Sequence, residues 1–82
     1  SVSFRKWFGE LPPAVQERAR KTYRLFLQDP GHPSLRFKQV HASEPMMSIR
    51  VGLGYRALGV MHRNEVVWFW IGSHADYDRL VR

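Results

Sequence analysis

The stretch from Met46 to Tyr77 constrains the fold more than any other part of the chain. It holds three short apolar runs separated by turn residues, namely residues 46–51, 55–62 and 66–71. Val, Ile, Trp and Phe favour a pleated sheet, whereas Gly52, Gly54 and Asn64 suit the bends between the runs. We therefore expect three consecutive antiparallel strands joined by tight turns.

Two helices are expected before this sheet. Apolar side chains recur at helical spacing over residues 4–10 and again over residues 14–28. The Pro12-Pro13 pair separates the two segments, because proline suits the first turn of a helix but not its interior. The Asp29-Pro30-Gly31 sequence ends the second helix, since the residue before a proline disfavours helical geometry.

The remaining segments complete an α+β fold. Residues 35–40 alternate in the way typical of a strand with a basic outer face, and residues 75–82 suit a turn and a short C-terminal helix. The chain is therefore expected to form a single domain over residues 1–82. Its two N-terminal helices pack on one face of a four-stranded antiparallel sheet in which sequential strands are neighbours.

The last strand is apolar on both faces. Strict alternation places Val67, Phe69 and Ile71 on one face and puts Trp68 and Trp70 together on the other. A strand of this kind is normally covered on both sides, and helices of the chain supply only one cover. Either the C-terminal segment or a partner segment laid across the sheet could supply the second.

Composition narrows the classes of function. The 82 residues include no cysteine, so no disulfide supports the core, and no apolar run is long enough to span a membrane. We expect a cytoplasmic protein without a membrane partner. Thirteen Lys and Arg against seven Asp and Glu give a net charge of +6, and ten of the thirteen are Arg. This bias suits phosphate recognition, although a basic surface that only confers solubility is the alternative.

One cluster of residues could carry chemistry. No cofactor or metal is expected, because the four histidines have no cysteine partners and no i, i+4 spacing. In a meander, Arg50 and Arg56 lie on adjacent strands beside their shared turn, and His74 follows the end of the next strand, close to Tyr77. Such a set could bind a phosphodiester and transfer a proton. The other basic residues expected nearby are Arg36, Lys38 and Arg63.

A purely structural interpretation of the same residues stays open. Arg50 and Arg56 could pair with Glu44 and Glu65. In that case His74 is an exposed loop residue, and the ring of Tyr77 only anchors the C-terminal helix.

Order and spacing of several short motifs nevertheless resemble a known family. The motifs are Asp29-Pro30, Leu35-Arg36-Phe37-Lys38, Ser48-Ile49-Arg50-Val51-Gly52, Gly54-Tyr55-Arg56-Ala57 and Ile71-Gly72-Ser73-His74-Ala75-Asp76-Tyr77. Following two helices, they resemble the RelE/ParE superfamily of toxins from bacterial type II toxin–antitoxin systems, and the ending is similar to HigB-like members. The likeness covers nearly the whole chain.

The resemblance implies a function and roles for residues. The RelE branch cleaves messenger RNA in the ribosomal A site, without a metal, by attack of a ribose 2′-hydroxyl on its own phosphate. By resemblance, Arg50 and Arg56 hold the phosphate, His74 is general acid or base, and Tyr77 stacks on a base or assists proton transfer. The outer basic residues Arg36, Lys38 and Arg63 would contact RNA. The implied protein partner is a cognate antitoxin, which would cover Trp68 and Trp70.

The sequence also departs from the family. Members commonly begin with a strand, for which only residues 1–3 are available here, and RelE has more lysines near the site. The alternatives are a ParE-like toxin that inhibits DNA gyrase without cutting RNA, a degenerate toxin that only binds its antitoxin, and a general nucleic-acid-binding domain. A nuclease is expected to lose cleavage on His74→Ala or Arg56→Ala with little change in stability.

Overall fold

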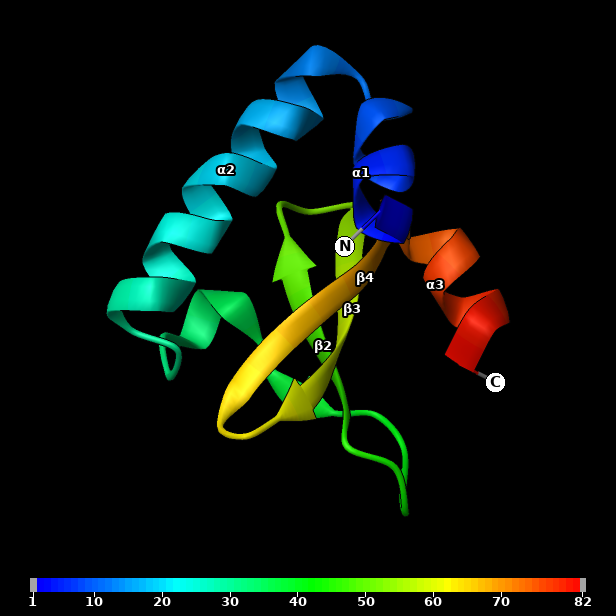
Figure 1. The fold of residues 1–82 in the computed structure, drawn as a ribbon. Helices are drawn as coiled ribbons and strands as arrows, with labels where there is room; N and C mark the ends of the chain where they lie inside the picture. The colour runs from blue at the N-terminus through cyan, green and yellow to red at the C-terminus, as the bar shows by residue number, and fades with distance from the viewer. Residues whose placement is uncertain (1, 82) are drawn as a thin grey trace.

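The computed structural model describes residues 2–81 and has the expected α+β architecture (Figure 1). Its elements are, in chain order, α1 (Val2–Gly9), α2 (Pro13–Gln28), the 3-10 helix η1 (Pro33–Leu35), β1 (Lys38–Gln39), β2 (Met46–Val51), β3 (Tyr55–His62), β4 (Glu65–Ser73) and α3 (His74–Val81). Within the described residues, the four strands form one antiparallel sheet in the order β1-β2-β3-β4. The predicted sheet topology is therefore confirmed.

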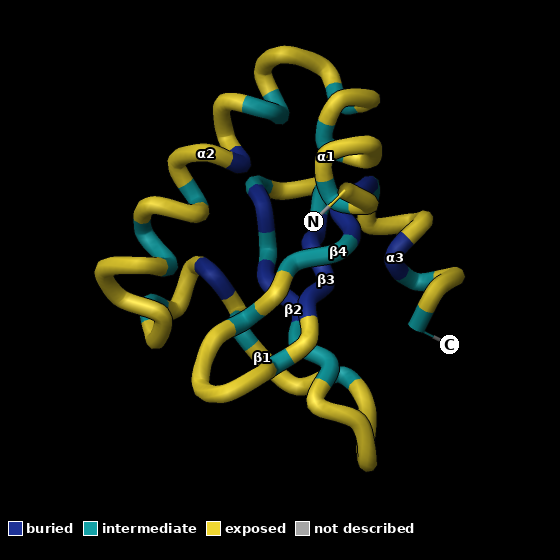
Figure 2. Tube along the Cα trace, viewed as in Figure 1, coloured by how far each residue is buried: buried dark blue, intermediate teal, exposed yellow. Residues whose placement is uncertain are grey.

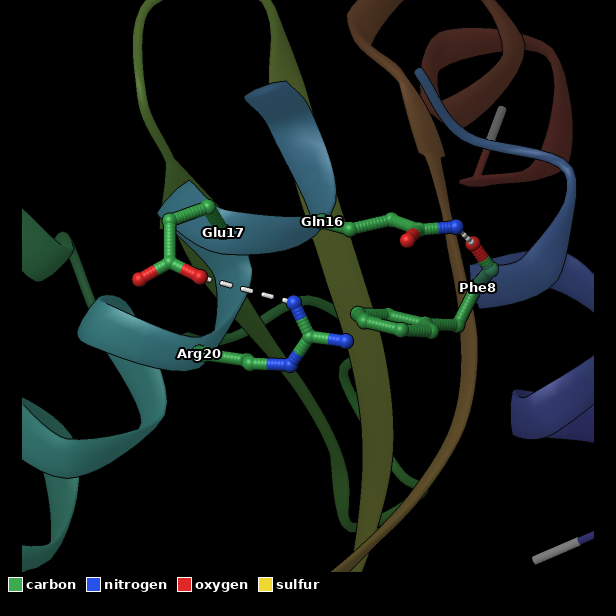
Figure 3. Close-up of polar contacts among 4 residues, drawn as sticks. All are labelled: Phe8, Gln16, Glu17 and Arg20. Carbon is green, nitrogen blue, oxygen red and sulfur yellow. Dashed lines mark hydrogen bonds and ion pairs between the residues drawn. The ribbon is translucent and has the colours of Figure 1, made fainter. Parts of the chain in front are cut away.

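Helices α1 and α2 form a hairpin whose corner is fixed by side-chain contacts from α2 (Figure 3). The Gln16 side-chain amide donates a hydrogen bond to the Phe8 carbonyl oxygen at 3.0 Å. The Arg20 guanidinium lies 5.2 Å from the centre of the Phe8 ring and 3.5 Å from a carboxylate oxygen of Glu17. The Phe8 carbonyl oxygen also accepts a hydrogen bond from the Leu11 N–H at 3.1 Å, so the side chain of Gln16 adds a second bond that ties α2 to the end of α1.

The hairpin covers one face of the sheet. The buried residues of this first core come from α2, η1 and the three long strands, and they are Ala19, Leu35, Ile49, Val51, Ala57 and Ile71. They appear as dark segments on the sheet and on the inner side of α2 in Figure 2. The core on this side is small for a domain of this size, so the outer cover of α1 and α2 matters for its stability.

Helix α3 packs against the opposite face and supplies the second cover. Tyr77 on this helix, Leu58 on β3 and Trp70 on β4 are buried together there. The C-terminal segment of the chain itself, rather than only a partner, therefore covers the outer side of the central strands. The sheet is a middle layer between α1 and α2 on one side and α3 on the other (Figure 1).

A β-bulge in β4 changes which face of the sheet the side chains in the first half of this strand point to. Leu58 is opposite Trp70 in the ladder, but the next residue of β3, Gly59, is opposite Trp68. Phe69 is therefore an extra residue without a partner of its own, and the alternation of side chains shifts by one position across it. The expectation that Trp68 and Trp70 share one outer face is wrong.

The two tryptophans consequently belong to different layers. Trp68 packs on the side of the helical hairpin, with its ring edge against Phe26 at 5.5 Å between ring centroids. Trp70 lies on the α3 side against Tyr77 and is only 6% exposed. Neither residue forms the continuous aromatic outer surface that strict alternation predicts.

The predicted strand over residues 35–40 is much shorter in the structure. Residues Pro33–Leu35 form η1, and Arg36 adopts a left-handed conformation at φ 46°, which no extended strand can contain. Leu35 is buried in the first core, so this turn is fixed by packing. Only Lys38 and Gln39 pair with β2.

Candidate functional site

Arg50 and Arg56 lie on adjacent strands beside their shared turn, as predicted, and the structure makes them direct neighbours. They form a cross-strand pair in the β2–β3 ladder, one residue from the end of each strand. Gly72 of β4 lies opposite Arg56 on its other side. Because directly opposite residues point to the same face, both arginines lie on the α3 side of the sheet.

Arg56 is the interior member of the pair, with only 5% of its surface exposed. Its Nε donates a hydrogen bond to the Ser48 hydroxyl at 2.7 Å, and one terminal nitrogen donates to the Arg36 carbonyl oxygen at 3.3 Å. Burial lowers the pKa of Arg56 below its usual value, and the nearby charges of Arg36 and Arg50 add to this, while Tyr77 opposes it. A guanidinium remains protonated in proteins, so a positive charge is held beneath this surface at neutral pH.

Tyr77 connects Arg56 to helix α3. The Arg56 guanidinium lies 5.0 Å from the centre of the Tyr77 ring, and the Tyr77 side chain is itself buried. His74, one turn earlier on the same helix, has its ring centroid 5.7 Å from that of Tyr77. The ring of Tyr77 thus contacts both the buried arginine and the exposed imidazole.

Arg36 and Lys38 border this surface at the edge strand. Both side chains are exposed. Lys38 is opposite Ser48 in the β1–β2 ladder, which places it on the α3 side beside the Ser48–Arg56 hydrogen bond. The left-handed turn at Arg36 directs its carbonyl oxygen to Arg56 and leaves its own side chain on the surface.

Arg50 is half-buried and only partly engaged. Its Nε donates a hydrogen bond to the carbonyl oxygen of Gly52 at 3.0 Å. Within residues 2–81, no carboxylate oxygen lies within 4.0 Å of the guanidinium nitrogens of Arg36, Arg50 or Arg56. The alternative pairing of these arginines with Glu44 and Glu65 is therefore not formed in this part of the chain. Arg36 and Arg50 at the surface and Arg56 beneath it, none with a carboxylate partner among residues 2–81, make a positive region that suits an anion. This region is called the arginine surface below.

His74 begins helix α3 beside the β2–β3 turn. Its backbone N–H donates to the Gly54 carbonyl oxygen at 2.8 Å, and the Ser73 hydroxyl accepts from the Asp76 N–H at 3.1 Å as an N-cap. Its side chain is 55% exposed, with Nε2 3.5 Å from a carboxylate oxygen of Asp78. The imidazole is thus accessible at the border of the arginine surface, and Asp78 can orient it.

Arg63 does not belong to this surface. It sits in the β3–β4 hairpin turn with φ 52°, next to the His62–Glu65 pair. Arg56 is at the opposite end of β3, and seven residues of strand separate them by about 23 Å. The expectation that Arg63 lies near the other basic residues is wrong, because that hairpin points away from the β2–β3 turn.

Ser48 is the residue of this site that the sequence does not reveal. It is completely buried, and its hydroxyl accepts the hydrogen bond from Arg56 Nε. A lone serine within the otherwise apolar run Met46–Val51, two residues before an arginine, is the only signal that could have identified it. Buried hydroxyls require a partner, and a buried arginine requires an acceptor.

Two classes of feature are not found in the described residues. Residues 2–81 contain no group of three or more His, Asp or Glu side chains arranged to hold a metal ion. None of the helices in this range is both long enough and apolar enough to cross a membrane.

Comparison with known proteins agrees with the fold. The fold is similar to that of a chain in the crystal structure of a RelB-RelE antitoxin-toxin complex from Methanococcus jannaschii. The TM-score is 0.76 over 100% of this chain and 96% of the other, at 13% sequence identity. No curated protein matches the sequence. The family model described as ParE-like toxin domain matches residues 13–79, which is most of the chain. The chain therefore belongs to the ParE-like toxin domain family, within the RelE/ParE superfamily of toxins.

Proposed function

We propose that this chain is the toxin of a toxin–antitoxin pair and acts as an endoribonuclease on messenger RNA. The observation that carries the proposal is the group of three arginines, Arg36, Arg50 and Arg56, which have no carboxylate partner among residues 2–81. One of them, Arg56, contacts the same Tyr77 ring as the exposed imidazole of His74. A phosphodiester is the anion that such a surface favours, because guanidinium groups bind its oxygens in pairs.

The proposed reaction uses the RNA as its own nucleophile. The ribose 2′-oxygen attacks the adjacent phosphorus, the bond from phosphorus to the 5′-oxygen breaks, and the products are a 2′,3′-cyclic phosphate and a free 5′-hydroxyl. Arg50 and Arg36 hold the phosphate oxygens and stabilise the charge that builds on them. The 2′-hydroxyl loses a proton as it attacks, and the leaving 5′-oxygen gains one. His74 carries out one of these two proton transfers, and water carries out the other. No metal takes part in this scheme.

Arg56 and Tyr77 have a different part in this proposal. Arg56 is buried and bonded to Ser48 and to the Arg36 carbonyl, so it contributes a fixed positive charge from beneath the phosphate. Tyr77 contacts both Arg56 and His74 and in this scheme sets the position of the imidazole. Both are therefore proposed as positioning residues, with Lys38 extending the basic surface toward the rest of the RNA.

Induced expression in a bacterial host tests the proposal. Transcript ends are mapped by primer extension for the wild type, for His74→Ala and for His62→Ala, an exposed histidine at the far end of β3 that serves as the matched control. New 5′ ends with the wild type and His62→Ala, and none with His74→Ala, are the expected result. If cleavage requires the ribosome, the same 5′ ends should also form in a mixture of the purified protein, ribosomes and mRNA.

A second candidate function is favoured by the family match. The matching family is named for ParE, so a toxin that inhibits DNA gyrase by protein binding is the alternative. Growth arrest with intact transcripts, unaffected by His74→Ala, would overturn the nuclease proposal in favour of this one. Absence of arrest together with tight antitoxin binding would indicate a degenerate toxin.

The proposed partner is an antitoxin, by analogy with the RelB-RelE complex that the fold resembles. A cavity of about 480 Å³ lies between α1, α2 and the sheet, and its apolar lining includes Phe8, Tyr23, Val67 and Trp68. A protein segment with apolar side chains and a negative net charge would fit this cavity and the +6 charge of the toxin. Trp68 is therefore proposed as an antitoxin contact, while Trp70, only 6% exposed, offers a partner little surface.

A further inference from the structure

A second pocket opens where β2 is no longer covered by β1. Strand β1 pairs with β2 only at Met47 and Ser48, so the later part of β2 has no strand on that side. Helix α2, η1 and the β2–β3 turn surround this gap and leave a cavity of about 320 Å³. The pocket lies at the open edge of β2, next to the arginine surface described above.

The lining of this pocket is strongly basic. Arg18 and Lys21 reach it from α2 and Arg50 from β2, and the hydroxyl-bearing residues Thr22 and Ser34 also line it. None of its lining residues is acidic. Within residues 2–81, no carboxylate oxygen lies within 4.0 Å of the side-chain nitrogens of the three cationic residues.

Two arginines of α2, Arg18 and Arg20, have different surroundings. Arg20 is occupied, because it pairs with Glu17 and stacks on Phe8 at the helical corner (Figure 3). Arg18 instead packs beside Gly52, where an added Cβ would lie 3.4 Å from the Arg18 Cγ. The stem of Arg18 is thus held against the β2–β3 turn, which fixes the location of its charge at the pocket.

Arg50 joins the pocket to the proposed cleavage site. It lines the pocket, and it also stands opposite Arg56 in the β2–β3 ladder on the α3 side. One residue at the open edge of β2 therefore borders both positive surfaces. A chain of evenly spaced negative charges that is held at Arg50 can continue over this edge to Arg18 and Lys21.

We propose that this pocket binds a backbone phosphate of the same RNA strand, adjacent to the phosphate held at the cleavage site. The inference rests on the proposed nuclease function. Guanidinium and ammonium groups of Arg18, Lys21 and Arg50 supply both the charge and the hydrogen-bond donors for phosphate oxygens. The hydroxyls of Thr22 and Ser34 already bond to the Arg18 carbonyl oxygen and to His32 Nδ1. The exposed Leu53 side chain offers an apolar surface for a ribose or base. An acidic protein segment fits less well, because the larger apolar cavity lies on the other side of α2.

Binding of a short single-stranded RNA with a 2′-O-methyl group at each position, which blocks the attacking oxygen and so prevents cleavage, tests this inference. The variants are Arg18→Gln, Lys21→Gln and their combination, which keep much of each side-chain stem. Arg24→Gln is the matched control, because Arg24 is an exposed residue of α2 outside the pocket. Affinity is measured over a range of salt concentrations. Each lost phosphate contact is expected to reduce the slope of log affinity against log salt by about 0.7, whereas Arg24→Gln keeps the wild-type slope.

The outcomes separate this inference from the proposed function. If the wild type cleaves RNA but the pocket variants keep the slope and affinity of Arg24→Gln, the pocket inference is overturned and the nuclease proposal stands. If the pocket variants lose antitoxin affinity while their RNA slope is unchanged, the pocket is a protein contact and the inference is also overturned. Failure of the wild type to bind this RNA at all, with intact transcripts in cells, overturns both proposals.

Discussion

The guanidinium of Arg56 lies 5.0 Å from the ring centre of Tyr77, so the middle of the sheet and the C-terminal helix meet through a cation–π contact. The same guanidinium holds Ser48 and the carbonyl of Arg36. One buried side chain therefore joins three segments that are distant in sequence, namely the turn at Arg36 before β1, the sheet and α3. This arrangement makes Arg56 a support for the site as well as a source of charge.

Arg56→Ala is expected to reduce the free energy of unfolding by about 2–4 kcal/mol, because it leaves a cavity and a buried Ser48 hydroxyl without its donor. The control is Arg50→Ala, whose half-buried side chain has a single hydrogen bond and should cost less than about 1 kcal/mol. Urea unfolding followed by circular dichroism measures both. Equal, small losses would contradict the supporting role of Arg56.

This expectation replaces the one from sequence, in which Arg56→Ala leaves stability nearly unchanged. Loss of cleavage in that variant would consequently not identify Arg56 as a catalytic group. His74→Ala is the cleaner test of chemistry, because its side chain is exposed and its backbone contacts do not depend on the imidazole.

Ser48→Ala is expected to destabilise the fold by about 1–3 kcal/mol, because the charged Nε of Arg56 then lacks its nearest acceptor in a buried setting. In a double-mutant cycle with Arg56→Ala, the two losses should not add, since each removes the same hydrogen bond. Thermal or urea unfolding of the two single variants and the double variant measures this coupling. Additive losses would show that the contact contributes little.

Gly59→Ala tests the bulge in β4. An added Cβ at Gly59 would lie 2.5 Å from a Val66 methyl carbon and 3.0 Å from the backbone oxygen of Val67, so the strands must shift. The expected loss is about 1–3 kcal/mol. Gly54→Ala is the matched control, because no atom lies within 4 Å of its added Cβ, and it should be nearly neutral. Similar unfolding midpoints for the two variants would contradict the close packing at the bulge.

The same bulge marks the limit of what the sequence could predict. The strands, their order and the location of Arg50 and Arg56 on adjacent strands beside one turn follow from apolar runs, turn residues and short connections. The face of the sheet on which Trp68 lies does not follow from the sequence. It is set by the extra residue at Phe69, which depends on how β3 and β4 pack around Gly59 and which no local signal requires.

The site shows the same division. His74 and Arg50 follow from the strand ends, since both lie next to the β2–β3 turn. The burial of Arg56 could not be predicted, because it depends on the tertiary approach of Tyr77 and on a buried acceptor at Ser48. The distance of Arg63 could have been predicted from the length of the β3–β4 hairpin, which places its turn at the far end of the sheet.

Tyr23→Ala tests the proposed antitoxin surface. Tyr23 is 51% exposed and lines the cavity between the helices and the sheet, so its removal should weaken binding of the cognate antitoxin by about 2 kcal/mol or more. Leu27→Ala is the control, because Leu27 is also on α2 and is 63% exposed but lies outside the cavity. Calorimetric titration measures both affinities, and equal weakening would contradict this placement of the antitoxin.

Arg50→Gln and Arg63→Gln together test where RNA binds. Each variant removes one positive charge from the chain, so the general attraction between protein and RNA changes equally. Arg50 lies between the arginine surface and the basic pocket, whereas Arg63 is at the other end of β3. Loss of a charged phosphate contact costs about 1.5–3 kcal/mol, so Arg50→Gln should weaken binding of non-cleavable RNA about ten- to hundred-fold.

Arg63→Gln should change this affinity less than about two-fold, as expected for an exposed charge without a fixed contact. Fluorescence anisotropy at one salt concentration is sufficient, because the two proteins have the same net charge. Equal and small effects would mean that RNA is held by charge alone, in the manner of a general nucleic-acid-binding domain. A larger effect for Arg63→Gln would place the RNA along the β3–β4 hairpin and remove His74 from the reaction.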